Sequence, residues 1–442
     1  MKKSWFFRIA VVSGVTIMLG AAVMAWNMVD EKQAVAATDY QQLQKFSQVM
    51  EMVRRSYVEP VTDEKLIDGA LAGMLTSLDP HSTYMTKEQY GEMQVDTKGE
   101  FGGLGIEISS ADSGIRVVSP IEDTPAYRAG IKAGDIIIKI NDQLAKEMTL
   151  TDAVKLMRGK PGTSITLTIF RAGVDKPMQF KLVRAIVKTK SVKSDFLAPG
   201  YAYLRITQFQ ERTTKLLRKQ IMDLKKQAGG SLYGAVLDLR NNPGGLLDEA
   251  VSVSDTFLNK GGIVSTKSRT GKNLSFKADK GDLLDGVPIV VLINNGTASA
   301  AEIVSGALQD DHRAILMGTR SFGKGSVQSV VPLPDGSAIK LTTALYYTPR
   351  GRSIQATGIT PDILAKPMRV ASNGQNGPNT AVFERNLKGH LQNGNGAKNA
   401  KPAKKAHGHP SEMMQKRLGI DTVLQRGLDM LEGLHALNAT KH

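Results

Sequence analysis

Apolar residues recur at helical spacing near the start of the chain and alternate with polar residues farther along it. An N-terminal helical region is expected over 38–91. Apolar residues recur there every three to four positions, first over 40–59 and then over 66–78, which predicts two amphipathic helices. In the first helix the apolar positions are Leu43, Phe46, Val49, Met50 and Val53. Residues 92–185 instead contain short alternating runs separated by glycines, which predict strands and turns of a small separate domain.

From residue 201 onward, short apolar runs alternate with longer amphipathic segments. The runs predict strands at 201–206, 234–239 and 288–293. The segments between and after them predict helices at 212–228, 247–258 and 299–310. Alternation of this kind is typical of a sheet covered by helices. We therefore expect an α/β domain over 186–366.

The two ends of the chain differ from these domains. Residues 367–410 are rich in Asn, Gly, Lys and Pro and lack periodicity, which predicts a flexible linker. A last helix is expected over about 411–437, within a C-terminal segment that runs from 411 to 442.

The N-terminus has the pattern of an export signal. Three cations precede an apolar run over 9–29, and small residues follow it at Ala34, Ala36 and Ala37. The run is close to the roughly 20 residues that span a bilayer, so an uncleaved anchor is the alternative to a cleaved signal. Residues 1–37 therefore predict an exported protein, in the periplasm or at the extracytoplasmic face of the inner membrane.

Composition narrows the chemistry. Hydrophobic residues make up 41% and charged residues 22%, as in a folded domain. The chain has no cysteine, which excludes thiol catalysis, disulfides and thiolate metal sites. The net charge is +15, but no aromatic and basic recognition motif accompanies it, so we expect no nucleic acid partner. No metal or nucleotide motif is present, and we expect no cofactor.

Ser299 is the first candidate for chemistry. The strand over 288–293 runs into the sequence NNGTASAAE, which places Ser299 at the first turn of the following helix. Free backbone N–H groups and the helix dipole stabilise developing negative charge there. A serine that merely caps the helix is the simpler alternative.

A nucleophilic serine needs a base, and Lys324 is the candidate. The nearest histidine in the sequence, His312, lies 13 residues farther along, roughly 20 Å away if the helix continues. A lysine can act as the base when burial favours its neutral amine. Lys324 lies in SFGKGSVQ, and the amide of Gln328 can orient the amine without adding negative charge. A flexible surface lysine is the alternative.

Two backbone amides are candidate donors to the oxyanion. The Ala300 amide follows the nucleophile directly. The second donor is expected in LDLRNNPGG, where a buried strand ends in a turn that exposes N–H groups. We prefer Gly245 over Gly244 for this role. A turn without a catalytic role is the alternative.

Over residues 40–365 the chain resembles the carboxyl-terminal processing peptidases, also called tail-specific proteases. The resemblance rests on LDPHST, GLGI, DLRNNPGG, NGTASAAE, GITPD and FGKGSVQ, with 25 residues from Ser299 to Lys324. It implies a multidomain α/β protein whose catalytic domain has the architecture of the Clp protease and crotonase. The chain departs from the family at Thr297 and Ala301, where serines are common, but neither position carries the attacking hydroxyl.

The resemblance also assigns roles. It implies that Ser299 attacks, Lys324 is the base and Gln328 supports the lysine, while the amides of Ala300 and Gly245 form the oxyanion hole. Family members often have an acidic residue at the position of Asp310. The helical distance from Ser299, roughly 16 Å, favours a structural role for this residue. Arg240 either braces the oxyanion turn or is solvated.

The resemblance further implies that 92–185 is an inserted PDZ domain. Glycines leave the amides of Leu104, Gly105 and Ile106 free to hold a terminal carboxylate, while an extended peptide adds as a strand. Apolar side chains of the helix over 150–157 would line the pocket for the last residue. We therefore expect partners with apolar C-termini; a glycine-rich hairpin without a ligand is the alternative.

These inferences predict an exported serine endopeptidase that recognises protein C-termini and cleaves through an acyl-enzyme, processing or degrading cell-envelope proteins. The resemblance also raises the hypothesis that the PDZ domain blocks the active site until substrate arrives. A scaffold that binds C-termini but has lost its chemistry is the second hypothesis. A third is a peptidase that depends on an adaptor or on a homo-oligomer assembled through the helices at 40–80 and 411–437.

Overall fold

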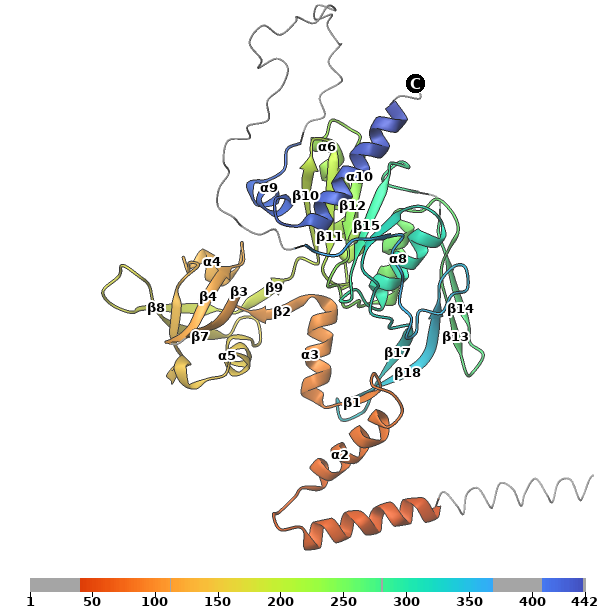
Figure 1. Cartoon of the computed structure of the whole chain (residues 1–442). Helices are drawn as coiled ribbons and strands as arrows, with labels where there is room; N and C mark the ends of the chain where they lie inside the picture. Colours follow the sequence, from red (N-terminus) through yellow and green to blue (C-terminus); the bar gives the residue numbers. More distant parts are fainter. Residues whose placement is uncertain (1–39, 112, 280, 369–407, 440–442) are drawn as a thin grey trace, which may run out of the picture. The chain divides into compact units, whose positions relative to one another are not determined.

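The computed structural model describes residues 40–368, apart from 112 and 280, and residues 408–439 (Figure 1). The chain divides into two compact units, Met1–Thr86 and Lys87–His442, and each is described by itself. The predicted export segment and most of the predicted linker lie outside the described residues and stay predictions. Within the described residues, no helix combines the length and apolar character that crossing a membrane requires.

The described part of the first unit, residues 40–86, is largely helical, as predicted. Residues 40–56 form one helix, and α2 (Asp63–Thr76) follows, with the Thr62 side chain capping its first turn. The first helix ends before the predicted residue 59 because Pro60 disfavours helical backbone at the residue before it. The Asp79 carboxylate then accepts hydrogen bonds from the His81 and Ser82 amides, which shapes the LDPHST turn before β1 (Thr83–Met85).

The second unit begins with helix α3 (Lys87–Lys98), part of which occupies positions where the sequence predicted strands and turns from residue 92. That prediction was wrong because α3 buries no residue and therefore carries no apolar period for a pattern to detect.

A six-stranded antiparallel sheet forms the predicted strand-rich domain. Its order is β3-β4-β5-β7-β8, with the short β6 paired to β5. These strands are β3 (Ile106–Ala111), β4 (Gly114–Pro120), β5 (Ile136–Ile140), β6 (Gln143–Leu144), β7 (Ser164–Phe170) and β8 (Met178–Val183). The helical elements α4 (Pro125–Arg128), η1 (Ala145–Glu147) and α5 (Leu150–Met157) complete the domain. The predicted helix over 150–157 is confirmed, and a capping box between Thr149 and Asp152 starts it.

The strand-rich domain is an insertion in the chain. Strand β2 (Glu100–Gly103) leads into it and pairs antiparallel with β9 (Ala185–Lys188), which leads out of it. The chain therefore enters and leaves the domain through one two-stranded ribbon.

The α/β domain is built on a six-stranded sheet with the order β10-β11-β12-β15-β16-β19. Strands β10 and β11 pair antiparallel, and the other pairs are parallel. The strands are β10 (Val192–Ala198), β11 (Tyr201–Ile206), β12 (Gly234–Asp238), β15 (Ile289–Ile293), β16 (Ile315–Gly318) and β19 (Ile363–Leu364). Parallel pairing places the carboxyl ends of β12 and β15 side by side, which positions the two turns of the candidate site.

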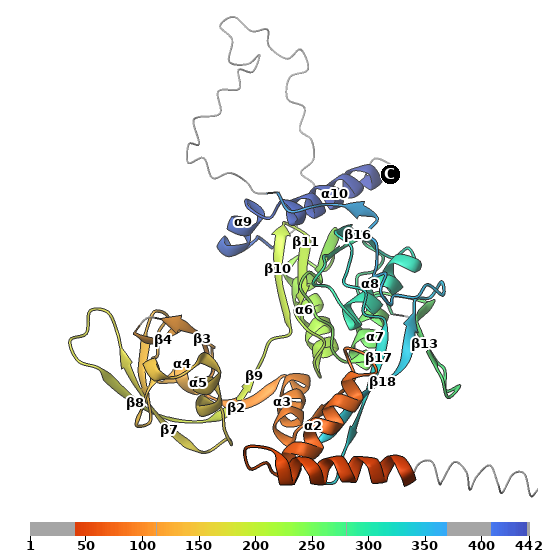
Figure 2. The ribbon, with the colours of Figure 1, turned by 60° about the horizontal axis from the view of Figure 1, so that its bottom comes forward.

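Helices cover both faces of this sheet (Figure 2). Leu237 and Val291 belong to a core shared with α6 (Thr213–Gln227), α7 (Leu247–Asp255) and α8 (Ala300–Asp310). Their neighbours Val236 and Val290 belong to a second core, shared with the C-terminal helices. Side chains of a strand point alternately to opposite faces, so the continuous apolar runs are explained by burial on both sides. The predicted alternation of strands and helices is confirmed.

A second sheet packs beside the first core. Strand β18 (Ala338–Tyr347) pairs antiparallel with β17 (Ser326–Pro332) and with β13 (Gly262–Ser268), and β13 pairs with β14 (Leu274–Lys277). Tyr346 of β18 belongs to the core that contains α8. This sheet therefore brings residues from far along the chain to helix α8, which begins directly after Ser299.

The C-terminal segment forms two helices, not the single predicted one. These are α9 (Glu412–Leu418) and α10 (Thr422–Ala439). Gly419 ends α9, and the Asp421 carboxylate accepts a hydrogen bond from the Leu424 amide at the start of α10 (3.1 Å). The apolar period continues across this break, which is why the pattern predicted one helix.

Candidate active site

Ser299 lies where the nucleophile was predicted, between β15 and α8. Its backbone has φ 53° and ψ −116°, a conformation that residues with a Cβ rarely adopt. The side chain is nearly buried, with 7% of its surface exposed. A strained residue persists only where its surroundings hold it, and here the neighbour Glu302 does so.

The Glu302 carboxylate connects two loops of the site. It is fully buried and accepts a hydrogen bond from the Ser299 amide (2.8 Å). It also accepts from the amides of Gly323 (2.7 Å) and Lys324 (2.9 Å) and from the Ser321 hydroxyl (2.6 Å). One side chain thus holds the backbone of Ser299 and the loop that contains Lys324 in a fixed relation.

The charge state of Glu302 depends on two opposing influences. Burial raises its pKa above the usual range, because a buried carboxylate loses its hydration. The four hydrogen bonds oppose this rise without cancelling it, because each donor favours the ionised form. All four partners are donors, and the cage around the carboxylate therefore suits the anion.

We expect Glu302→Gln to lower kcat by about 10²-fold and to destabilise the fold by roughly 2 kcal/mol. The amide presents an NH₂ group to N–H donors, so at least one of them loses its acceptor and the two loops separate. Peptide cleavage and thermal unfolding measure the two effects.

The control for this variant is Glu249→Gln. The Glu249 carboxylate also accepts backbone amides, from Arg212 (2.9 Å) and Thr214 (2.7 Å), but it does not line the pocket of Ser299. It should lose stability without a comparable loss of kcat. An unchanged kcat in folded Glu302→Gln would contradict the role assigned to the carboxylate.

Ser299 and Lys324 line the same pocket, which has a volume of about 650 Å³. Gly245, Gln328 and Tyr346 also line it. Lys324 is half-buried and follows β16 in the loop that Glu302 holds. The fold therefore brings together residues that lie 79 positions apart, from 245 to 324, in the sequence.

The turn after β12 approaches Ser299 closely. A Cβ on Gly244 would lie 2.7 Å from the Ser299 Cβ and 3.0 Å from the Ala300 nitrogen, so only glycine fits. A Cβ on Gly245 would lie 2.1 Å from the Phe209 carbonyl oxygen. The turn is consequently pressed against Ser299 on one side and the backbone at Phe209 on the other.

The two glycine amides differ in their hydrogen bonds. The Gly244 amide donates to the Asn242 side chain (2.9 Å) and is thereby occupied. Within the part of the chain that the structure describes, the amides of Gly245 and Ala300 donate to no protein acceptor. These two amides are therefore available to a ligand oxygen, as a pair of oxyanion donors requires.

Gln328 lies on β17 with its NH₂ group engaged. The group donates to the Ser326 hydroxyl (2.9 Å), and to the Ser326 carbonyl and the Thr342 hydroxyl at 3.3 Å each. The Oε1 atom is then the end of the side chain that can accept a hydrogen bond from an amine.

Sequence reasoning missed two residues of the site, Glu302 and Tyr346. The spacing Ser299-x-x-Glu302 is the signature of a capping box and could have indicated the first. Tyr346 forms a hydrogen bond with the Ser299 side chain, and burial raises its pKa, so the phenol stays protonated at neutral pH. No local pattern connects Tyr346 with Ser299, because strand pairing alone brings them together.

Asp310 lies away from the pocket of Ser299. Its buried carboxylate accepts the Arg350 amide (3.0 Å) and forms an ion pair with Arg352. Both partners belong to the loop after β18, which matches the structural role expected for Asp310. His312 bonds to the Arg350 side chain and lines another pocket with Asp310.

The predicted peptide-binding residues line a small groove in the strand-rich domain. Leu104, Gly105 and Ile106 form one side of it, and Val154 and Met157 of α5 the other. The carbonyls of Leu104 and Gly105 accept bonds from the amides of Ala126 (3.0 Å) and Ile121 (2.8 Å). Within the described residues, the amides of Leu104 and Gly105 have no protein acceptor, which leaves them available to a carboxylate.

Three family models match the chain. Residues 200–365 match Peptidase family S41, and residues 116–171 match the PDZ domain. Residues 12–89 match the model described as the activating protease CtpB N-terminal domain.

Similar proteins include two curated relatives and a solved structure. The chain is 50% identical over 384 residues to the carboxy-terminal-processing protease of Bartonella bacilliformis, covering 86% of this chain and 87% of the relative. It is 38% identical to the carboxy-terminal processing protease CtpA of Bacillus subtilis, covering 76% and 71% of the two chains. The solved structure, a photosystem II D1 C-terminal processing protease, is 30% identical, with coverage of 73% and 92% and a TM-score of 0.44.

Proposed function

Because this chain belongs to the carboxy-terminal processing proteases of peptidase family S41 and carries a PDZ domain, we propose that it cleaves peptide bonds with a Ser299 and Lys324 dyad. The observation that carries the proposal is the shared pocket. Ser299, Lys324 and Gly245 all line it, and the Ala300 amide lies beside the turn that contains Gly245.

In the proposed reaction, the neutral amine of Lys324 accepts the proton of the Ser299 hydroxyl as the oxygen attacks the substrate carbonyl. The Gly245 and Ala300 amides stabilise the resulting oxyanion. Lys324 then gives the proton to the leaving amine, which leaves an acyl group on Ser299. Water then attacks this ester while the same lysine accepts its proton, and the lysine passes that proton to the departing Ser299 oxygen, which restores the hydroxyl and the neutral amine.

Gln328 and Tyr346 support this chemistry in different ways. With its NH₂ group engaged by Ser326, Gln328 is left with Oε1 to orient the Lys324 amine. An amide oxygen does so without adding a negative charge, which would favour the protonated amine. The protonated phenol of Tyr346 holds the Ser299 side chain in its rotamer before substrate binds. Neither residue exchanges a proton with substrate.

Substrates are proposed to bind through their C-termini. The free amides of Leu104 and Gly105 hold the terminal carboxylate, and the peptide extends along β3 as an added strand. The groove at this end is lined mostly by apolar side chains, including Ile108 and Val154. Proteins with apolar C-termini are therefore the proposed substrates.

The cellular setting is proposed from the sequence. The N-terminal pattern over 1–37 supports export, to the periplasm or the extracytoplasmic face of the inner membrane. Cell-envelope proteins are then the accessible substrates, for C-terminal processing or for degradation.

Assembly is proposed through the helices at the ends. The helix over 40–56 exposes a row of large apolar side chains, which an adaptor or a second copy of the chain would cover. In the C-terminal segment, by contrast, most large apolar residues pack on the chain's own sheet, while Met413, Ile420 and Leu437 remain exposed.

Tail recognition can be tested with Val154→Asp. A carboxylate in the groove repels the substrate's terminal carboxylate, so KM for an unfolded reporter with an apolar tail should rise about tenfold, which corresponds to about 1.4 kcal/mol. Steady-state cleavage measures KM, and kcat should change little because the substitution is in the groove.

Thr151→Asp is the matched control for this experiment. It adds the same charge to an exposed position of α5 outside the groove and should leave KM unchanged. A reporter ending in aspartate should behave with the wild-type enzyme as the apolar reporter does with Val154→Asp. If KM were the same for the wild type and Val154→Asp, and for reporters with apolar and aspartate tails, the result would argue against recognition by the PDZ domain.

A further inference from the structure

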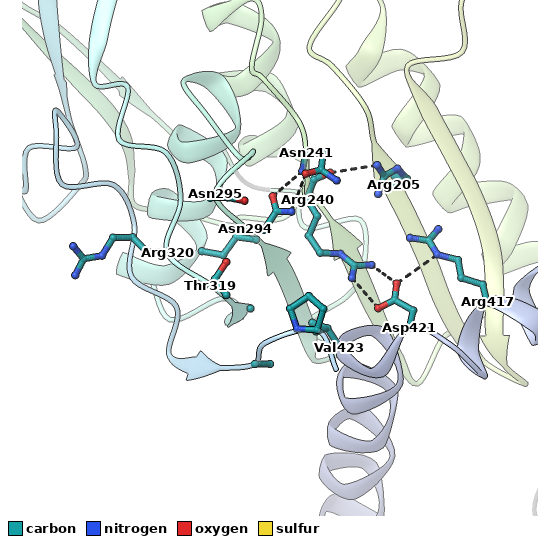
Figure 3. A pocket seen from close by; sticks show the side chains of 14 residues that line it. Arg205, Arg240, Asn241, Asn294, Asn295, Thr319, Arg320, Arg417, Asp421 and Val423 are labelled. Atoms are coloured by element: carbon teal, nitrogen blue, oxygen red, sulfur yellow. Dashed lines mark hydrogen bonds and ion pairs between the residues drawn. The ribbon is translucent and has the colours of Figure 1, made fainter. Parts of the chain in front are cut away.

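Arg240 connects the oxyanion turn to the C-terminal segment. It follows β12 and precedes the turn by a few residues, and its guanidinium forms two parallel hydrogen bonds with Asp421, at 2.9 and 2.8 Å. Figure 3 shows this pair at the edge of a pocket of about 880 Å³. Asp421 itself lies between α9 and α10, 181 residues farther along the chain.

Asp421 supplies the second of the two negative charges that lie among three guanidinium groups. The fully buried Asp238 accepts hydrogen bonds from Arg205 (3.1 Å), Arg240 (2.8 Å) and Arg417 (3.0 Å). Three guanidinium groups thus share two carboxylates. Burial alone raises the pKa of Asp421, but the hydrogen bonds and charge of Arg240 hold it below the usual range, so this carboxylate is ionised.

Loss of the Asp421 charge leaves three cations around one buried carboxylate. Arg240 and Arg417 then repel each other with no second anion between them. The Arg240 side chain is only 13% exposed, borders the pocket and keeps two hydrogen bonds to Asp238 (2.9 and 2.8 Å), so the relief open to it is to pivot about that carboxylate toward the pocket. A displaced guanidinium pulls on the backbone at the beginning of the turn.

The backbone after Arg240 transmits this displacement to the active site. Asn241 exchanges two hydrogen bonds with Asn294, each 2.9 Å long, and so ties the oxyanion turn to the turn that precedes Ser299. Gly244 touches Ser299, with no space for even a methyl group between them. The turn cannot shift without moving its donor relative to the nucleophile.

Docking of the C-terminal segment does not depend on this ion pair. Met414, Leu424, Leu428 and Leu431 anchor the segment in a core that it shares with the central sheet. This apolar burial is the dominant attraction. The specific effect of Asp421 is therefore on Arg240 and not on whether the segment binds.

We propose that Asp421 is a positioning residue for catalysis, because it holds Arg240 and thereby the oxyanion turn that carries Gly245. The inference deepens the proposed function and rests on it. The C-terminal helical segment then has two roles: it packs on the sheet, and through Asp421 it positions the oxyanion turn.

The test is Asp421→Asn in the full chain. Asparagine keeps the cap on α10 but removes the charge. We expect kcat on an apolar-tailed unfolded reporter to fall 10- to 100-fold, less than the loss expected for removing an oxyanion donor itself. KM should stay within twofold, because the peptide groove is untouched. Asp421→Glu, which restores the charge, should recover part of the kcat.

A second readout isolates the oxyanion donors. A peptide boronic acid forms a tetrahedral adduct on Ser299 with one oxygen on those donors, so its affinity should fall by the same factor as kcat. Glu412→Gln is the control, because it removes an exposed ion pair with Lys416 on the same segment and should change neither quantity.

Several outcomes are decisive. Wild-type kcat in Asp421→Asn overturns the inference, and so does a lower kcat with unchanged boronate affinity, which is what a general loss of structure predicts. If Asp421→Asn does not fold, the double variant Arg240→Gln with Asp421→Asn removes both charges and is judged by the same two measurements. A wild-type chain that cleaves no reporter is a different result: it refutes the proposed function, and the inference with it.

Discussion

Ser299→Ala is expected to reduce cleavage of an unfolded, apolar-tailed reporter by about 10⁴-fold or more, because no other group in the pocket replaces the attacking oxygen. The fold should persist. The Glu302 carboxylate binds the backbone amide of residue 299, not its side chain, so the loops stay connected in the variant.

The measurement is reporter cleavage by the chain without residues 1–37, with thermal unfolding recorded in parallel. Ser305→Ala on the same helix is the matched control, since its hydroxyl donates only to the Ala301 carbonyl (2.7 Å) and its loss should leave kcat near the wild-type value. Cleavage by Ser299→Ala at a comparable rate would rule out Ser299 as the nucleophile.

Lys324→Ala should lower kcat by about 10³-fold or more, because the Ser299 hydroxyl then loses the base that accepts its proton. The loop should remain in place, since Glu302 and Gln355 hold it through the amides of Lys324 (2.9 Å) and Gly325 (3.0 Å). Binding of the tail is expected to be unchanged.

Chemical rescue provides the sharper measurement. A small primary amine in solution can occupy the space left by the side chain and should restore part of the activity of Lys324→Ala but none of that of Ser299→Ala. Lys267→Met is the control for loss of a lysine charge, as its amine lies over the Tyr347 ring (4.5 Å) and outside the pocket. Full activity of Lys324→Ala would mean that another group is the base.

The same experiments separate the protease from a scaffold. A wild-type chain that binds apolar tails but never cuts them, even with candidate adaptors, would favour the alternative of a PDZ protein without chemistry. Cleavage that depends on Ser299 and Lys324 would instead support the dyad.

Much of the architecture could be predicted from sequence periodicity. The strands before the two turns of the candidate site are continuous apolar runs, and the predicted strand over 288–293 differs from the observed β15 by one residue. Such runs indicate strands that are buried on both faces of the sheet, and this pattern is visible in the local sequence. Helix α3 was missed because it buries no residue and so carries no apolar period. The break at Gly419 was missed because the apolar period continues across it.

The residue types of the candidate site were also visible in the sequence, because a nucleophile at a helix start and glycines in a tight turn are local requirements. The residues that contact them in the folded protein could not be identified from the sequence. The Glu302 contacts across two loops, the position of Tyr346 beside Ser299 and the Arg240–Asp421 pair each join segments far apart in the chain. The order in which strands pair and the face on which a helix docks decide such contacts, and only the tertiary structure contains that information.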